Sequence, residues 1–292
     1  MPTLLQTVPA LFVFLWSTGW IVAGFSARLA DPLWFLLLRF TTAAAIVALI
    51  AVVMKAPWPR SRRDVAHAMA SGVMLHTIYL AGVWWAVANG VPAGVSGIMA
   101  GLQPVLTTLL APKLAGERIG PHQVAGIVLG FSGVILVLTP KIVGVDPAAL
   151  REIAVPLGVN LIGMLSVTLG TFYQKRFVSS GDLRTTTTWQ YVGAALTMLP
   201  LMLLFGEARA EWNLTLMLTM AWSVLALSVG GIGLFLFLIA RGAVSRTAAF
   251  IYLVPAASAL MAYLIFGETL TPVQFVGMAI TATGVWLATR RT

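Results

Sequence analysis

The sequence contains no cysteine among its 292 residues and only three histidines. A chain without cysteine can form neither a disulfide bond nor a thiolate metal site. The three histidines are scattered and form no H-E-x-x-H pair, so this common pattern of catalytic zinc sites is missing as well. We therefore expect the protein to hold no metal and no other cofactor.

Charged residues are also scarce. Asp, Glu, Lys and Arg make up 9% of the chain, apolar residues make up 59%, and the mean hydropathy is +0.94. Soluble domains are about one-quarter charged, so most of this surface is expected to face a lipid bilayer rather than water. The net charge of +9 does not indicate a nucleic-acid partner, because the basic residues fall in short segments between apolar runs.

Ten apolar runs have about 20 residues each, the length that a helix needs to cross the hydrocarbon core. No Lys or Arg occurs between Met1 and Thr7, which favours an uncleaved membrane helix over a secretory signal peptide. The predicted fold class is all-α integral membrane, with ten transmembrane helices. The predicted spans are Leu5–Phe25, Leu33–Val53, Val65–Ala88, Ala93–Lys113, Pro121–Thr139, Ile153–Lys175, Thr185–Phe205, Leu216–Ile239, Arg246–Phe266 and Pro272–Thr289.

Lys and Arg are distributed unevenly between alternate connecting segments. Thirteen fall on one side of the membrane, four fall on the other, and Arg39 lies inside a span. Because cytoplasmic loops carry the excess of Lys and Arg, both termini are predicted to be cytoplasmic. The thirteen are Lys55, Arg60, Arg62, Arg63, Lys113, Arg118, Lys175, Arg176, Arg184, Arg241, Arg246, Arg290 and Arg291; the four are Arg28, Lys141, Arg151 and Arg209.

A shift of 151 residues superimposes one half of the sequence on the other. The pattern P-x11-G-E-x3-P-x-Q-x2-G-x6-G-V begins at Pro104 and again at Pro255. The predicted repeats are residues 1–145 and 146–292. Each contains five spans, an odd number, so the second repeat must cross the membrane in the opposite direction. Inverted repeats are typical of secondary transporters, although an inert scaffold or a channel could also be built this way.

This doubled pattern closely resembles the end of each half in the EamA-type proteins of the drug/metabolite transporter superfamily. The resemblance covers the full length and implies a bacterial inner-membrane exporter of small metabolites, with ten spans and both termini inside. Within the family, the sequence is most similar to the YddG-type exporters of aromatic amino acids. The small multidrug-resistance proteins of the same superfamily depend on a glutamate in their first span. No Asp or Glu lies in the body of any span here, so a cation/proton antiporter of that design is not expected.

The proline pair at Pro104 and Pro255 marks a candidate substrate site. Helices interrupted at corresponding positions of two repeats indicate a binding site, although simple kinks relieved by neighbouring helices are common in membranes. Gly230 and Gly231 suggest a further hinge, or close packing. The residues predicted to contact substrate are His76, Tyr79, Met99, Gln103, Trp16, Trp20, Asn160, Met164 and Tyr252.

Several of these residues have an alternative interpretation. His76 near mid-membrane could carry protons or contact substrate, or could bond another helix as a neutral side chain. The stripe of Phe12, Trp16 and Trp20 is more typical of lipid-facing packing than of a ligand wall. Arg39, near the external end of its span, could bind a substrate carboxylate, but its position favours a structural role.

The function that this pattern supports is export of neutral or aromatic amino acids, by alternating access at a midplane site between the repeats. An amino acid could place its ammonium on carbonyls freed near the prolines or on aromatic faces, and its apolar side chain near Met99 and Met164. Exporters of drugs, nucleosides or other organic solutes, and a lipid flippase, remain alternatives. An enzyme is not expected, because no nucleophile–base pair or acid cluster lies within the spans. A monomer is expected.

Overall fold

The computed structural model describes residues 2–91, 93–143, 151–178, 180–241, 244–266 and 269–290. Helices make up 86% of the structure, and the described residues contain no β-strand beyond an isolated bridge between Ala30 and Ala210. The helices are α1 (Pro2–Leu29), α2 (Pro32–Val53), α3 (Arg62–Gly72), η1 (Val73–Ile78), α4 (Tyr79–Ala88), α5 (Ala93–Ala115), α6 (Pro121–Ile142), α8 (Ala154–Phe177), α9 (Leu183–Phe205), α10 (Leu214–Trp222), η2 (Ser223–Gly231), α11 (Ile232–Arg241), α12 (Val244–Ala249), η3 (Phe250–Tyr252), α13 (Leu253–Phe266) and α14 (Pro272–Thr289).

Among the described residues, eight helices are long and apolar enough to cross a bilayer, by length and composition. Two shorter apolar helices, Thr7–Gly19 and Thr247–Met261, fall within the first and ninth predicted spans. Large apolar side chains point outward along the bundle, with exposures of 69% at Leu109, 71% at Val155 and 73% at Leu204. Such a surface is stable only against lipid. The predicted all-α membrane fold is confirmed.

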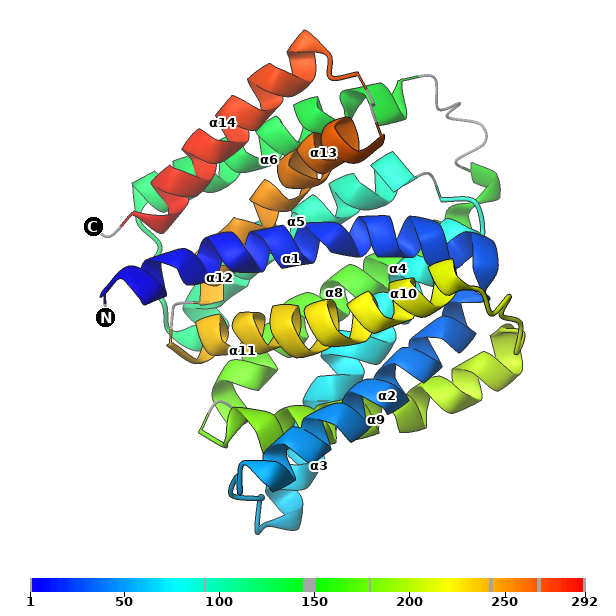
Figure 1. Cartoon of the computed structure of the whole chain (residues 1–292). Helices are drawn as coiled ribbons and strands as arrows, with labels where there is room; N and C mark the ends of the chain where they lie inside the picture. The colour runs from blue at the N-terminus through cyan, green and yellow to red at the C-terminus, as the bar shows by residue number, and fades with distance from the viewer. Residues whose placement is uncertain are drawn as a thin grey trace.

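The helices form a bundle with a tightly packed pair at each edge (Figure 1). Helices α6 and α14 pack along their length at one edge, α2 and α9 pack at the other, and α1 lies between, against α13 and η2. Both chain ends lie on the same side. We call that side, with residues 54–61, 116–120 and 180–182, the terminal face. The side with loops 30–31, 89–91 and 206–213 is the opposite face.

The α6–α14 contact depends on glycines at matched positions. A Cβ added to Gly126 would lie 2.6 Å from the carbonyl oxygen of Gly284, and one added to Gly284 would lie 2.7 Å from that of Gly126. Likewise, a Cβ added to Gly133 would lie 2.8 Å from the carbonyl oxygen of Gly277, and one added to Gly277 would lie 2.9 Å from that of Gly133. Because Gly126 corresponds to Gly277 and Gly133 to Gly284 under the 151-residue shift, the two contacts are copies of each other. Only glycine permits backbones to approach this closely.

Two membrane helices contain wide π-helical turns that the sequence did not predict. Segment η1 interrupts the helix between α3 and α4, and η2 interrupts the helix between α10 and α11. Shifted by 151 residues, η1 falls inside η2. Such turns are rare, and they are frequent at functional sites. The predicted hinge at Gly230 and Gly231 lies at the end of η2, where both glycines pack near Leu15 of α1.

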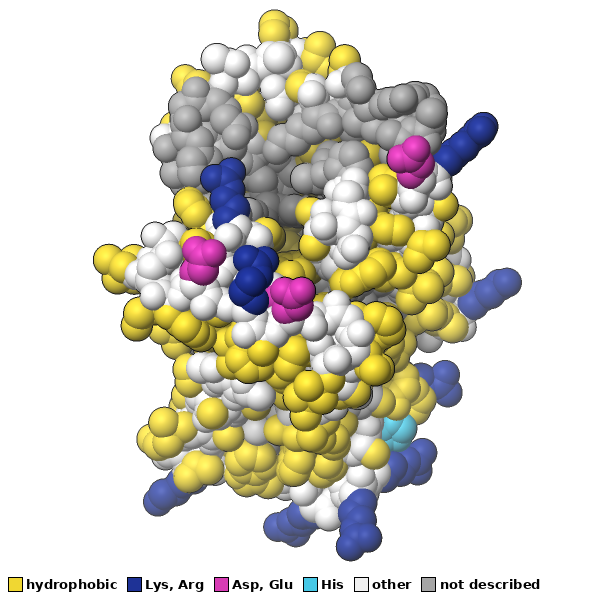
Figure 2. All heavy atoms as spheres, turned by 90° about the vertical axis from the view of Figure 1, so that its right-hand side faces the viewer, with side chains coloured by type: hydrophobic (Ala, Val, Ile, Leu, Met, Phe, Trp, Pro, Cys, Tyr) yellow, Lys and Arg dark blue, Asp and Glu magenta, His cyan; other side chains and the backbone are white. Residues whose placement is uncertain are grey.

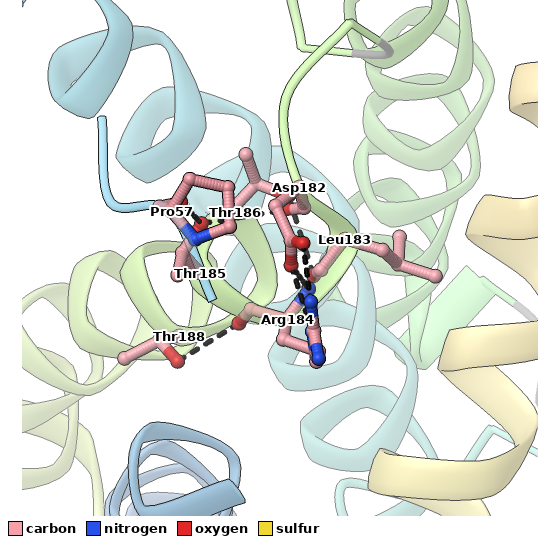
Figure 3. Close-up of polar contacts among 7 residues, drawn as sticks. All are labelled: Pro57, Asp182, Leu183, Arg184, Thr185, Thr186 and Thr188. Carbon is pink, nitrogen blue, oxygen red and sulfur yellow. Dashed lines mark hydrogen bonds and ion pairs between the residues drawn. The ribbon is translucent and has the colours of Figure 1, made fainter. Parts of the chain in front are cut away.

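Helix α9 begins with a charged cap on the terminal face (Figure 3). The Asp182 carboxylate accepts hydrogen bonds from the backbone N–H of Arg184 at 2.9 Å and from its guanidinium at 3.0 and 2.6 Å. Thr185 donates to the carbonyl of Pro57 at 3.0 Å, which joins this cap to the segment between α2 and α3. The arrangement satisfies N–H groups that a helix start leaves free.

Acid is expected to weaken this cap. Hydrogen bonding from the Arg184 side chain holds the pKa of Asp182 below its ordinary value. A carboxylate whose pKa is lowered by folding stabilises the protein above its unfolded pKa of about 3.9, and this contribution is lost as the pH falls through the folded value. At pH 7, Asp182→Asn should lower the free energy of unfolding by about 0.5–1 kcal/mol, because the pair is partly exposed.

The test is thermal unfolding of the detergent-solubilised protein between pH 7 and pH 3. The difference between wild type and Asp182→Asn should shrink toward zero at the acid end. Asp64→Asn is the matched control, since Asp64 is exposed in the first turn of α3 and forms no ion pair with a described residue. A wild-type advantage that is equally large at pH 3 would contradict the prediction.

Candidate functional site

Two cavities in the middle of the bundle share a wall formed by Trp16 of α1 and Tyr79, the first residue of α4. The larger cavity has a volume of about 180 Å³ and the smaller one about 80 Å³. Both aromatic side chains are half-buried. Concave, mainly apolar sites with a few polar groups are the usual form of small-molecule sites, so the two adjacent cavities are the candidate substrate site.

The larger cavity lies between the two proline-containing helices. Gln103 faces it from α5, and Pro255 and Ser258 face it from α13, whereas Pro104 is buried outside its wall. The Gln103 side chain is 3% exposed, and its Nε2 has no hydrogen-bond partner among the described residues. The rest of the wall is mainly apolar, formed by Gly97, Ala100, Gly101, Val134, Val137, Leu138, Ile251, Val254 and Ala259.

The smaller cavity contains the buried charge of Arg39. This side chain is 6% exposed, and its Nε donates a hydrogen bond of 2.8 Å to Oγ of Ser228 in η2. Tyr191 of α9 donates to the backbone carbonyl of the same serine at 2.8 Å. Arg39 forms no ion pair with any acidic residue that the structure describes. The remaining wall is apolar and aromatic, and includes Leu75, Trp84, Leu227 and Ile232.

Of the predicted substrate contacts, the structure brings Trp16, Tyr79 and Gln103 to the cavities. The interpretation of the aromatic stripe as lipid-facing is wrong. Phe12 is fully buried, and its ring lies 5.1 Å from that of Trp16 and 5.6 Å from that of Phe235. The reason is that α1 packs between other helices of the bundle, which a helical period alone cannot reveal. The side chain of Trp20 lies outside the described residues.

Other predicted contacts lie away from the cavity walls. Asn160 donates a 2.8 Å hydrogen bond to Ser96 and joins α8 to α5. Met164 is 1% exposed, and Met99 is half-buried. Tyr252 is fully buried against Gly130 of α6. None of these lines either cavity, and their contact with substrate stays a prediction.

His76 lies behind the site rather than in its wall. Its ring is 1% exposed and stacks on that of Tyr191, with ring centres 4.7 Å apart. Neither ring nitrogen has a hydrogen-bond partner among the described residues. His76 therefore contacts the tyrosine that supports Ser228 and Arg39, and a direct part in transport stays a prediction.

Sequence reasoning favoured a structural role for Arg39 and missed Trp84, and both line the smaller cavity. A signal for Arg39 was present, since it is the one fixed charge well inside a predicted span. Trp84 stacks on Phe35, with ring centres 5.6 Å apart, which holds it inside the bundle. Among the described residues, no group of three His, Asp or Glu could hold a metal ion.

Hydrogen bonds join neighbouring helices on the terminal face. Glu117, in the loop after α5, accepts a 2.6 Å hydrogen bond from the backbone N–H of Val244 and a second from the hydroxyl of Ser245. Lys175 of α8 donates to the carbonyls of Ile239 and Ala240 at 2.9 and 3.1 Å. Figure 2 looks onto the opposite face, where the described side chains are mainly apolar, with a few acidic and basic ones among them.

Comparison with known proteins identifies the family. The model of the EamA-like transporter family matches residues 8–139 and again residues 156–290. The chain belongs to the EamA-like transporter family. This EamA-like protein is therefore a multi-pass membrane transporter and not an enzyme. The division of the chain at residues 145 and 146 stays a prediction.

Relatives of this EamA-like transporter include proteins named as exporters. A "probable amino-acid metabolite efflux pump" of Escherichia coli is 24% identical over 95% of this chain and 92% of its own length. A "probable terminal-alkyne amino-acid exporter" of Streptantibioticus cattleyicolor is 27% identical over 94% of this chain and 86% of its own. A solved crystal structure aligns with a TM-score of 0.81 at 19% identity, covering 97% of this chain and 96% of that one, which shows the fold.

Proposed function

We propose that this transporter exports small metabolites, most specifically neutral and aromatic amino acids, across a bacterial inner membrane. Substrate would bind in the two adjacent cavities and reach each side by alternating movement of residues 1–145 and 146–292. Both termini would lie in the cytoplasm, as the distribution of Lys and Arg predicts. A single chain is sufficient for this mechanism.

The observation that carries the proposal is the composition of the cavity walls. Trp16, Arg39 and Tyr79 come from the first half of the chain, and Leu227 and Pro255 come from the second. A site lined by both halves is the geometry that alternating access requires. Aromatic rings at the junction and an apolar larger cavity suit a substrate with an apolar or aromatic side chain.

Two further observations support export. The relatives named above include an amino-acid metabolite efflux pump and an amino-acid exporter. The hydrogen bonds of Glu117 and Lys175 join helices on the terminal face. If the terminal face is cytoplasmic, these bonds would hold the cytoplasmic side closed, as release of an exported substrate to the outside requires.

The test is counterflow in proteoliposomes with a panel of amino acids, nucleosides and organic cations. Phenylalanine and tryptophan should exchange fastest. Trp16→Leu and Tyr79→Leu should each lower kcat/KM for tryptophan by about two- to tenfold, since an aromatic contact contributes roughly 0.5–1.5 kcal/mol. Trp212→Leu is the control, because Trp212 is 60% exposed and lines neither cavity.

The panel also decides between the alternatives. Exchange of nucleosides or organic cations without amino acids would replace the proposal with export of other solutes. Lipid movement without exchange of any soluble compound would indicate a flippase.

A further inference from the structure

The geometry points to Arg39 as the residue that binds the substrate carboxylate, in a site that has no charged partner for an amino group. The protein would then transport monocarboxylates whether or not they carry an ammonium: amino acids, and also their N-acylated and 2-oxo forms. This inference rests on the proposed function and specifies its substrate class.

The first step is the state of the Arg39 guanidinium. The group carries five N–H donors. One of them, on Nε, is taken by Ser228, and the others form no hydrogen bond to any described residue. Because Arg39 lines the smaller cavity, these donors can reach a bound solute. A pair of adjacent guanidinium N–H groups matches the two oxygens of a carboxylate.

The second step is that the guanidinium is held in place. Ser228 lies in the wide turn η2, and Tyr191 donates to its backbone carbonyl. Three elements, α2, α9 and η2, therefore fix the direction of the Arg39 side chain. A charge held in a defined orientation loses little freedom when an anion binds. This support fits a binding group better than a side chain that reaches outward to water.

The third step is the charge balance of the site. None of the acidic residues that the structure describes lines either cavity. A buried cation without a counter-ion is costly, and an anionic solute would remove that cost. A zwitterion would bring a second positive charge that can meet only neutral groups, such as Gln103, Ser258 and the faces of Trp16 and Tyr79. The site is therefore complementary to a monoanion.

The two cavities give the substrate a direction. A carboxylate on Arg39 would occupy the smaller cavity, and the carbon chain would pass between Trp16 and Tyr79. The apolar group would then lie in the larger cavity, against Val134, Leu138 and Val254. Substituents on the carbon next to the carboxylate would face Trp16 and Tyr79. No described acidic side chain lines the wall there, so binding would not require an ammonium group.

The experiment uses the wild-type protein in proteoliposomes, with labelled phenylalanine as the reporter. Phenylpyruvate and N-acetylphenylalanine keep the carboxylate without an ammonium, whereas phenylalaninamide keeps the ammonium without a carboxylate. The two anions should inhibit phenylalanine exchange at least as strongly as unlabelled phenylalanine. Phenylalaninamide should be roughly 10- to 100-fold weaker, the loss expected for one charged hydrogen-bonding partner.

A variant then assigns the effect to Arg39. Arg39→Gln should lower kcat/KM for phenylalanine and phenylpyruvate alike, by roughly 10- to 100-fold. Arg28→Gln removes the same charge from an exposed position near the end of α1 and should leave both values unchanged. Because the competition pattern is measured on the wild-type chain, the inference can be tested even if Arg39→Gln fails to fold.

The outcomes separate this inference from the proposed function. Phenylalanine exchange that phenylalaninamide inhibits as strongly as phenylpyruvate does would overturn the role of Arg39 and leave amino-acid export standing. Transport of phenylpyruvate without transport of any amino acid would overturn amino-acid export and support the carboxylate site. Arg39→Gln protein that is folded and transports phenylpyruvate at the wild-type rate would also overturn the inference.

Discussion

Replacing Gly284 with alanine is expected to destabilise the protein by about 3 kcal/mol, the upper end of the usual cost of overpacking. The added Cβ would lie 2.7 Å from the carbonyl oxygen of Gly126 and 2.8 Å from Cα of Gly130. Both are backbone atoms, so no side chain can rotate to make room, and α6 and α14 must separate. The loss should appear as a lower thermal midpoint in detergent and a smaller monodisperse fraction.

Gly158→Ala is the matched control for that experiment. Gly158 lies in α8, and a Cβ added there meets no atom within 4 Å. Since alanine favours a helix by about 1 kcal/mol over glycine, this variant should be as stable as wild type or slightly more stable. If both variants unfolded at the same temperature, the close α6–α14 contact would not be a source of stability.

Replacing Glu117 with alanine is expected to open the terminal face. The Glu117 carboxylate accepts from the backbone N–H and hydroxyl groups of Val244 and Ser245, at the start of α12. Hydrogen bonds to a charged group contribute about 1.5–3 kcal/mol each. Under the proposed alternating access, losing them should favour the conformation open on this face by tenfold or more, since about 1.4 kcal/mol corresponds to a factor of ten.

The readout is modification of one engineered cysteine, which is free of background because the chain has no other. Thr107→Cys is suitable, because Thr107 is fully buried one turn before Ala111, which packs near Val244. A maleimide applied to the terminal face should label it at least about tenfold faster in the Glu117→Ala background. Glu152→Ala, at an exposed acid near the start of α8, should leave labelling unchanged. Equal labelling in both backgrounds would show that Glu117 does not hold this face closed.

Some features of the site were readable from residues alone. Tyr79 and Gln103 were predicted as site residues because a polar side chain inside an apolar run needs a protein neighbour. Arg39 carried the strongest signal, a charge inside a span, yet its distance from the helix end favoured a structural role. The structure places Arg39 in a cavity wall and in contact with Ser228, which lies 189 residues away in the chain.

Other features depend on which helices become neighbours. His76 and Met164 are as polar or as polarisable as the residues that line the cavities, but they face Tyr191 and the packed interior instead. A helical period tells which residues share a face, and it does not tell what that face meets. The stripe of Phe12 and Trp16 shows this well, since the same spacing would suit lipid or protein.

The amino-acid sequence by itself determined the membrane fold, the helix positions, the 151-residue repeat and the family. These are set by hydrophobic length and by local patterns, which act within one helix or between copies of one motif. Only the tertiary structure decided that Arg39, Trp16 and Tyr79 meet in one site, that η1 and η2 widen matched helices, and that Glu117 caps α12. Those features arise from contacts between residues far apart in the chain, which packing of the whole bundle selects.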